Sequence, residues 1–152
     1  MSSLDLLRIP SVADVGTRAD FNTVLSNDAA ANAEWLYTVP AGHYMKLVAV
    51  SVSCVQGNTQ TPRPYLVIDD GTNVILKAPG ASAVQSADIT SQYTWAEDLP
   101  LSAAAALTVN TAPLPAADNL ILGPGFRISS ETVGKGANTN YGKATLFVVD
   151  FT

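Results

Sequence analysis

Apolar and polar residues alternate along most of this chain, and this period of two is typical of strands that bury one face. The longest such stretch runs over residues 43–55 and is rich in β-branched side chains. Its alternation predicts that Tyr44, Val48, Val50 and Val52 share one face.

Shorter stretches of the same kind are separated by turn residues at intervals typical of antiparallel sandwiches. The expected strands are residues 35–39, 43–55, 65–68, 74–76, 89–95, 107–109, 120–122, 126–131 and 144–151, of which 107–109 and 120–122 are short pieces. One or two turns of helix are predicted at residues 100–107, where a proline precedes an alanine run. The sequence thus predicts an all-β domain of about eight strands over residues 34–152.

Three turns are marked by their residues. Pro40-Ala41-Gly42 and Gly123-Pro124-Gly125 are corners built from proline and glycine, each followed by a strand that an aromatic residue opens. Proline fixes φ near −65° and glycine tolerates positive φ, so the pair makes a tight corner. Asp69-Asp70-Gly71-Thr72 lies between two apolar runs and predicts a hairpin.

Residues 1–33 differ from the rest of the chain. Isolated apolar residues are mixed there with Pro10, Gly16 and alternating charges, and the stretch 26–33 reads as a linker. One interpretation is an N-terminal arm that becomes ordered on a partner, with contacts made by Leu6, Leu7, Ile9 and Val12. The other is an edge strand that packs on its own domain. The sequence leaves both open.

Composition narrows the classes of partner. Of the 152 residues, 47% are hydrophobic and only 14% are charged, below the usual quarter, so small polar residues and alanine must cover the surface. That surface suits a protein held in an assembly. The net charge of −5 and the scattered basic residues disfavour nucleic acid as a partner.

No stretch of 18 apolar residues is present, and the N-terminus lacks the features of a secretory signal, so we expect neither membrane insertion nor export. With Cys54 as its one cysteine, the chain can form no internal disulfide. These features fit a protein made in a reducing cytoplasm.

The residues that could do chemistry do not form a recognisable set. His43 is the single histidine and is expected at the rim of a strand, without an orienting carboxylate in its surroundings. Cys54 has no basic neighbour in sequence and is predicted to be a buried small hydrophobe. Glu97 and Asp98 are adjacent and would point to opposite faces of a strand, unlike a glycosidase pair.

Two loops look superficially like ligand sites. The Asp69–Asn73 stretch lacks the spaced oxygen ligands and the later glutamate of a calcium loop, and Gly134-Lys135-Gly136 lacks the remainder of a phosphate-binding loop. We therefore expect no catalytic residue, no metal and no cofactor.

Four aromatic residues alternate on two predicted strands: Trp35, Tyr37, Tyr93 and Trp95. Such residues are core in most proteins. If they were exposed, they would form a stacking platform for sugars, or Trp35 and Tyr37 would contact a protein partner.

The order of these elements carries a resemblance. Residues 39–47 resemble the strand start of small tailed-phage virion proteins, and residues 114–128, with Leu114-Pro115 and Gly125-Phe126-Arg127, are similar to a later element of the same proteins. The hairpin at 63–71 and the closing strand at 144–150 match in the same order. The second corner departs from the pattern, because Gly123 stands where proline is usual.

This resemblance implies a jelly-roll-like sandwich that acts as a capsid decoration (cement) protein. Its partners would be the major capsid protein or other virion subunits, it would form homotrimers on the capsid surface, and the arm of residues 1–33 would clamp neighbours. The alternative, from a different class, is a carbohydrate-binding jelly roll in a head fibre, knob or tail component. That alternative requires at least two of the four aromatic residues to be exposed.

Overall fold

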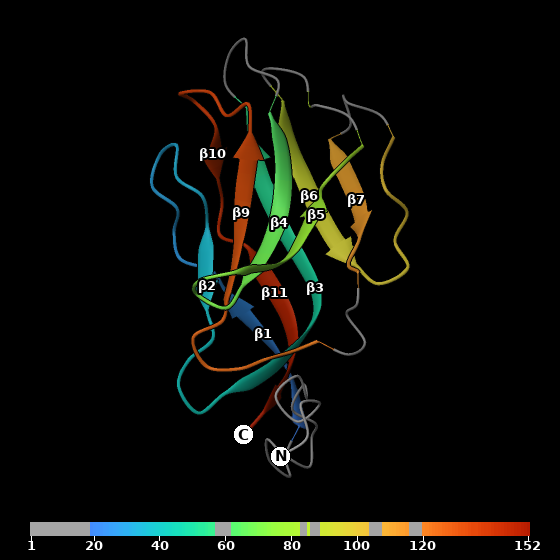
Figure 1. Ribbon diagram of the computed structural model, residues 1–152. Helices are drawn as coiled ribbons and strands as arrows, with labels where there is room; N and C mark the ends of the chain where they lie inside the picture. The colour runs from blue at the N-terminus through green and yellow to red at the C-terminus, as the bar shows by residue number, and fades with distance from the viewer. Residues whose placement is uncertain (1–18, 57–61, 83–84, 86–88, 104–107, 116–119) are drawn as a thin grey trace.

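The computed structural model describes residues 19–56, 62–82, 85, 89–103, 108–115 and 120–152. Within these residues all regular elements are strands, and no helix is present. The strands form one seven-stranded and one four-stranded sheet, which face each other across a common core (Figure 1). The prediction of an all-β sandwich is confirmed.

The long strand β3 organises the larger sheet, because it pairs with four other strands. In spatial order this sheet consists of β1 (Ala19–Leu25), β11 (Thr145–Phe151), β3 (Tyr44–Val55), β6 (Thr90–Ala96) and β7 (Val109–Pro113), with β8 (Ile121–Leu122) and β10 (Asn140–Tyr141) also paired to β3. The smaller sheet is β2 (Leu36–Thr38), β9 (Arg127–Val133), β4 (Arg63–Asp69) and β5 (Val74–Pro79).

One pair departs from the expected antiparallel arrangement. β6 and β7 run parallel, with Gln92 opposite Val109 and Ala96 opposite Pro113. Parallel neighbours need a crossover of about a dozen residues, and the connection from residue 97 to 108 is long enough for one. The helix predicted at 100–107 is absent from residues 100–103, and residues 104–107 lie outside the described part of the chain.

Both proline–glycine corners are present as predicted. Gly42 has φ of 81° and Gly125 has φ of 85°, and each turn is closed by a backbone hydrogen bond, from His43 N to Pro40 O (3.2 Å) and from Phe126 N to Gly123 O (3.1 Å). The corners also bond to each other through Val39, whose N–H donates to Phe126 O and whose carbonyl accepts from Gly125 N, both at 2.9 Å. They therefore lie at the same end of the sandwich.

The Asp-Gly turn joins β4 and β5 as a hairpin, with Gly71 at φ of 94°. Gly71 faces the second corner, since a Cβ on it would lie 4.0 Å from Gly125 O. One end of the molecule is thus built from three tight turns, and the C-terminal end of β11 lies at this end too (Figure 1).

The alternation in β3 is interrupted by a bulge. Phe147 pairs with Ala49 and Val148 pairs with Leu47, so Val48 is the extra residue. The buried face is therefore Met45 and Leu47 before the bulge and Val50, Val52 and Cys54 after it. The prediction that Tyr44 and Val48 share a face with Val50 and Val52 is wrong, because a bulge shifts the phase of all residues before it.

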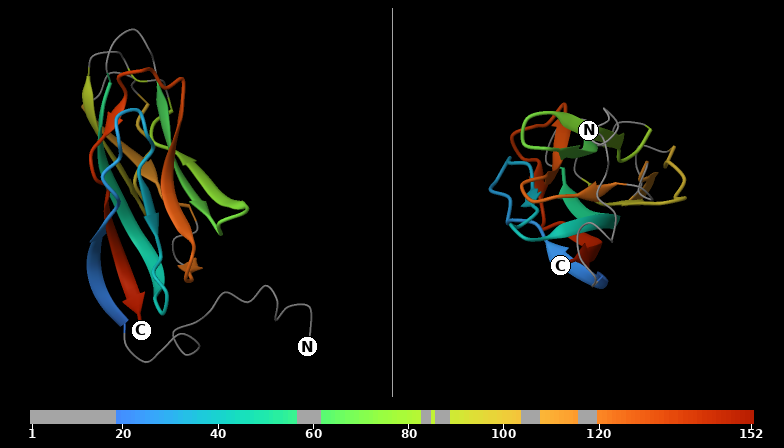
Figure 2. Two further views of the ribbon diagram at one scale, coloured as in Figure 1. Left: turned by 90° about the vertical axis from the view of Figure 1, so that its left-hand side faces the viewer. Right: turned by 60° about the horizontal axis from the view of Figure 1, so that its bottom comes forward.

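The segment expected as an arm is divided. Residues 1–18 lie outside the described part of the chain. Ala19–Leu25 forms β1, which pairs with β11 along its whole length at the edge of the larger sheet, as the alternative interpretation had it (Figure 2). The boundary at residue 33 is therefore displaced: residues 19–33 belong to the sandwich, because β1 completes its sheet and Ser26 N bonds to Ala144 O (2.9 Å).

Candidate functional site

The partner contacts expected from the sequence have different positions in the structure. Leu6, Leu7, Ile9 and Val12 lie outside the described residues. Trp35 is completely buried in the core, so its prediction as a partner contact is wrong. Tyr37 is half-buried, and its hydroxyl donates to Met45 Sδ at 3.6 Å. Burial, and secondarily the charge of Asp150, raise the pKa of Tyr37.

The aromatic residues do not form a sugar platform. Tyr93 and Trp95 stack on each other inside the core, with ring centroids 6.0 Å apart. Their polar atoms are used internally, since Trp95 Nε1 donates to Pro79 O (3.1 Å) and the Tyr93 hydroxyl donates to Gln85 Oε1. With Trp35 also buried, the carbohydrate-binding alternative lacks the exposed aromatic pair that it requires.

His43 has a carboxylate partner that the sequence did not reveal. Its Nδ1 lies 2.8 Å from Oδ2 of Asp150, which is 107 positions away in the chain. The pair closes the turn end of the sandwich between the first corner and β11. Asp150 Oδ1 is buried with no hydrogen-bond partner among the described residues. The pair explains how a carboxylate is tolerated at a nearly buried position.

Cys54 is buried, as predicted. Burial raises the pKa of its thiol to about 12, and the Gln56 amide donates to its sulfur at 2.9 Å. A thiol with this pKa stays protonated at neutral pH and is a poor nucleophile. The structure therefore gives Cys54 a packing role.

The carboxylates of the Asp-Gly turn are occupied by the turn itself. Asp69 Oδ1 accepts from Gly71 N (2.8 Å) and from Arg127 Nε (2.6 Å). Backbone N–H groups of Asn73 and Thr72 donate to Asp70 and lower its pKa. Within the described residues no group of three or more His, Cys, Asp or Glu side chains is placed to hold a metal.

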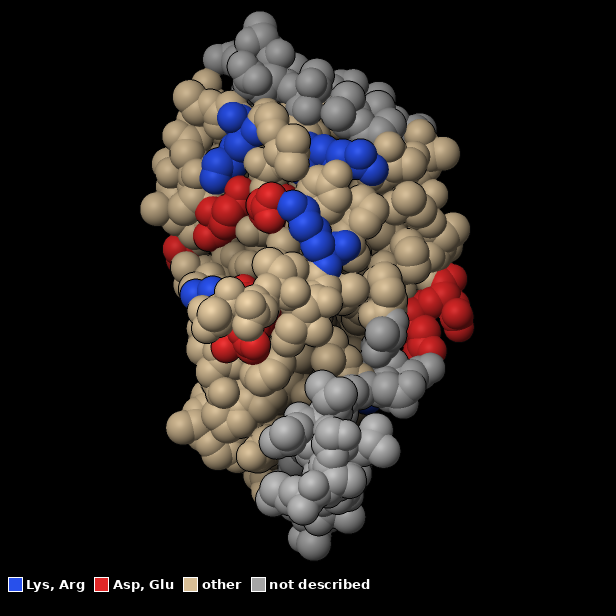
Figure 3. Space-filling view, in the orientation of Figure 1, with Lys and Arg blue, Asp and Glu red and all other residues tan. Residues whose placement is uncertain are grey.

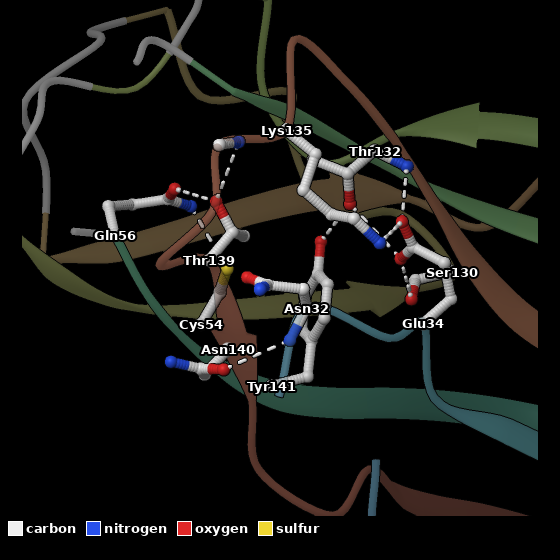
Figure 4. A network of polar contacts seen from close by, with 11 residues as sticks. Asn32, Glu34, Cys54, Gln56, Ser130, Thr132, Lys135, Thr139, Asn140 and Tyr141 are labelled. Carbon is white, nitrogen blue, oxygen red and sulfur yellow. Dashed lines mark hydrogen bonds and ion pairs between the residues drawn. The ribbon is translucent and has the colours of Figure 1, made fainter. Parts of the chain in front are cut away.

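A network of polar contacts is centred on the carboxylate of Glu34, in the segment just before β2 (Figure 4). Glu34 accepts from Ser130 Oγ (2.5 Å), from Thr132 N and Oγ1 (both 3.1 Å) and from Lys135 Nζ (3.1 Å). Lys135 belongs to the glycine-containing loop after β9, where Gly134 has φ of 71°. Glu34 thus fixes the chain entering β2 against β9.

The network extends to the larger sheet. Thr132 Oγ1 lies 2.5 Å from the Tyr141 hydroxyl on β10, and Tyr141 is directly opposite Cys54 of β3. Thr139 Oγ1 donates to Gln56 Oε1 at 3.4 Å, and Asn32 N donates to Asn140 Oδ1 at 3.2 Å. Burial raises the pKa of Tyr141 well above its ordinary value. The network joins the two sheets.

The outer face of the smaller sheet is charged (Figure 3). Lys77 Nζ bonds to Glu131 Oε1 (2.5 Å) and lies 4.9 Å from the centre of the Tyr65 ring. Arg63 lies 5.4 Å from the same ring centre. Charges of both signs paired in this way are typical of a solvated face.

The outer face of the larger sheet has a different character, and we call it the large-sheet face. The strand registers place its outward residues in rows across the sheet: Phe21-Val149-Lys46-Ile121, Thr23-Phe147-Ala49-Ala96, Leu25-Thr145-Ser51-Thr94-Thr111 and Ser53-Gln92-Val109. Lys46 is the one charged residue in these described rows. Phe21 and Leu25 are 68% and 56% exposed.

A face with a single charge in its described rows and with large exposed apolar residues is typical of surfaces that contact other proteins. Sequence reasoning missed Phe21 and Leu25, although Phe21, Thr23 and Leu25 alternate as an edge strand would. No local sequence pattern predicts the hydrogen bonds between Glu34 and β9, because the partners of Glu34 are about 100 positions away in the chain.

Two other regions were candidates for a site. A small apolar pocket between the sheets is lined by Leu47, Ile68, Leu76, Leu114, Pro115 and Leu120. Glu97 and Asp98 lie in the turn after β6, where Asp98 has φ of 58°. Among the described residues no helix is long and apolar enough to span a membrane.

In comparisons with known proteins, no family model, no curated protein and no solved structure matched this chain.

Proposed function

We propose that this chain is a non-enzymatic structural protein of a tailed-phage virion, most specifically a capsid decoration protein with a jelly-roll-like sandwich. It would bind across capsomer junctions of the major capsid protein on the capsid surface. The resemblance of the ordered corners, hairpin and closing strand motivates the family. The observation that carries the proposal is the large-sheet face, with exposed Phe21 and Leu25 and a single charge among its described rows.

The mechanism is mass action. A protein that binds the assembled shell and not its separate subunits lowers the free energy of the shell by RT ln(1 + [L]/Kd). At a free concentration of 100 times Kd this amounts to about 2.7 kcal/mol per site. Repeated over many junctions, that stabilisation would hold a filled head against internal pressure.

Two surfaces would share the binding. The large-sheet face would lie against the shell, so that the charged outer face of the smaller sheet points to solvent. The N-terminal residues, through Leu6, Leu7, Ile9 and Val12, would clamp a neighbour. Homotrimer formation is part of the same proposal, and the native mass of the free chain tests it.

The arm is tested with a chain that begins at Ala19. This boundary keeps β1 in place, whereas a deletion to residue 30 would also uncover β11. Binding of residues 19–152 and of the full chain to purified shells is compared by co-sedimentation. We expect at least tenfold weaker binding of the shortened chain, and equal binding would contradict the clamp.

Docking through the large-sheet face is tested by introducing a charged residue into it. Thr94 and Ser129 are both half-buried, outward residues of central strands, Thr94 on the larger sheet and Ser129 on the smaller one. Thr94→Lys is expected to weaken shell binding at least tenfold, while the matched control Ser129→Lys leaves it unchanged. Equal effects of the two variants, with the fold intact by circular dichroism, would contradict docking through the large-sheet face.

A further inference from the structure

The first strand leaves one edge of the larger sheet open. Among the described residues β1 pairs with β11 alone, and it is the outermost strand of the sheet. An open strand edge presents a row of peptide groups that can pair with another strand. In Figure 2 this edge runs along the outside of the molecule beside β11.

The hydrogen bonds fix which peptide groups point outward. Ser26 N donates to Ala144 O, so the peptide groups of Ser26, and by alternation those of Val24 and Asn22, point toward β11. Those of Phe21, Thr23 and Leu25 therefore point to the open edge. The Thr23 N–H supports this assignment of directions, because it donates to the side-chain Oδ1 of Asn22 at 2.8 Å and not to β11.

The part of this edge that would pair, from Phe21 to Leu25, lacks the usual protection against pairing, and Asp20, the one charge of β1, lies outside it. Natural edge strands carry lysine, proline, bulges or inward charges. From Phe21 to Leu25 the sequence is Phe-Asn-Thr-Val-Leu, with no charge and no proline, and the β1–β11 register has no bulge. Phe21 and Leu25 are the two most exposed large apolar residues of the strand.

We propose that β1 pairs antiparallel with β1 of a second copy, about a two-fold axis at Thr23. In this register Thr23 is opposite Thr23 of the second copy, and Phe21 is opposite its Leu25. Since all of these have outward peptide groups, they form hydrogen-bonded pairs. The contact is self-complementary, as a two-fold interface requires.

Charge and side-chain placement favour this register. It sets Asp20 opposite Ser26 of the second copy, so that no like charges are directly opposed across the pair. The two Phe–Leu pairs lie on the outer side, since Val24 is the β1 residue that packs against the core. The pairing therefore joins the large-sheet faces of two molecules into one continuous surface, on which Lys46 of each copy is the one charged residue of the described rows.

The association of free chains is expected to be weak. Two paired strands of seven residues bury less than the roughly 1,200 Å² of a stable interface. The Asn22 side chain must also release the Thr23 N–H before the central pair can form. We expect a Kd between about 1 µM and 1 mM, which becomes effective where copies are already held close together.

The register is tested by cross-linking the free full-length chain. Directly opposite residues of a hydrogen-bonded pair have Cα atoms about 5.5 Å apart, within the range of a disulfide. Under mild oxidation Thr23→Cys is expected to give covalent dimers at least ten times faster than Val109→Cys, a matched variant at the other edge of the same sheet. Cys54 does not compete, because it is buried.

Three measurements complete the test. In sedimentation, Phe21→Lys is expected to abolish the concentration-dependent rise in mass of the free protein, Val109→Lys to leave that rise unchanged, and Asn22→Ala to shift it to lower concentration. Equal cross-linking of Thr23→Cys and Val109→Cys would overturn the proposal. Faster cross-linking of Asn22→Cys than of Thr23→Cys would overturn it too, since it would place the axis one residue away. No shells are used, so the outcome is independent of the proposed function.

Discussion

Among the described residues, polar contacts converge most on the carboxylate of Glu34. Its acceptors are satisfied by Ser130, Thr132 and Lys135, and its side chain is 28% exposed. Hydrogen bonds to a charged group of this kind contribute about 1.5–3 kcal/mol. Glu34 therefore stabilises the fold more than an ordinary surface acid does.

Glu34→Gln keeps the size of the side chain and removes its charge. We expect a loss of about 2 kcal/mol in the free energy of unfolding, measured by urea denaturation at pH 7. The control is Glu131→Gln, which removes the charge of an exposed ion pair with Lys77 and is expected to cost at most about 1 kcal/mol. Equal losses in the free energy of unfolding would show that the network around Glu34 stabilises the fold no more than the exposed Lys77–Glu131 pair does.

Cys54 makes the stability of the fold decline at alkaline pH. A cysteine in the unfolded chain ionises near pH 8.5, whereas the native thiol has a pKa of about 12. The unfolded state alone loses a proton in this window, so the stability due to the protonated thiol is complete below pH 8.5 and declines as pH rises toward 12.

Between pH 8.5 and 9.5, where most tyrosines of the unfolded chain are still protonated, the slope of this decline rises from about 0.7 toward about 1.2 kcal/mol per pH unit. Cys54→Ala is expected to lack it, whatever its stability at pH 7. Urea midpoints at pH 7, 8, 9 and 10 measure both slopes. Parallel slopes in the two proteins would mean that the native thiol ionises like an ordinary one.

At the scale of elements, the two corners provide a direct comparison of backbone conformation. Gly42 and Gly125 both have positive φ, and a Cβ on either would meet nothing within 4 Å. Alanine at either position would therefore cost only backbone strain, about 1–2 kcal/mol. The corners are hydrogen-bonded to each other through Val39, so this strain would lie at a point where the two sheets are joined.

We expect Gly42→Ala and Gly125→Ala to lower the free energy of unfolding by similar amounts in urea denaturation. Gly123→Ala is the control: its φ is not positive, and its Cβ would lie 3.5 Å from Tyr44 Cε1, an ordinary contact. That change is expected to stay within about 0.5 kcal/mol. A Gly123→Ala cost as large as that of Gly125→Ala would refute the role given to left-handed backbone.

The elements that local sequence predicted are those with a local cause. The corners at Gly42 and Gly125 and the hairpin at Gly71 follow from residues that permit positive φ. Burial of Trp95 follows from the alternation along its strand. These features need no knowledge of which strands become neighbours.

The elements that were missed depend on distant partners. The bulge at Val48 exists only in relation to β11, and the parallel pairing of β7 with β6 depends on a crossover that no single turn encodes. The contact between His43 and Asp150 and the placement of β1 also join segments more than 100 positions apart. For the same reason Phe21 and Leu25 could be seen as strand residues but not as part of a surface.

At the scale of the whole molecule, the two outer faces differ in kind. One has Arg63, Lys77 and Glu131 around Tyr65, and the other has Lys46 among uncharged rows. Ion pairs between exposed groups are screened by salt, whereas contacts between uncharged apolar groups are not. Binding through the large-sheet face should therefore be insensitive to salt.

We expect the affinity for shells to change less than about threefold between 50 mM and 500 mM NaCl, because few exposed charges take part. Co-sedimentation over that range measures it, with the Lys77–Glu131 pair removed by Lys77→Ala as a control for the opposite face. A loss of binding by more than tenfold at high salt would indicate that the charged face makes the contact.

The pairing of the first strand with the last has a consequence for synthesis. β11 lies between β1 and β3, so β1 has no place to dock until residues 145–151 have been made. During translation β1 stays unpaired while the other strands assemble around β3. A chain cut short before residue 145 would keep Phe21 and Leu25 on an unpaired strand, so the open edge of the larger sheet forms only after β11 has been made.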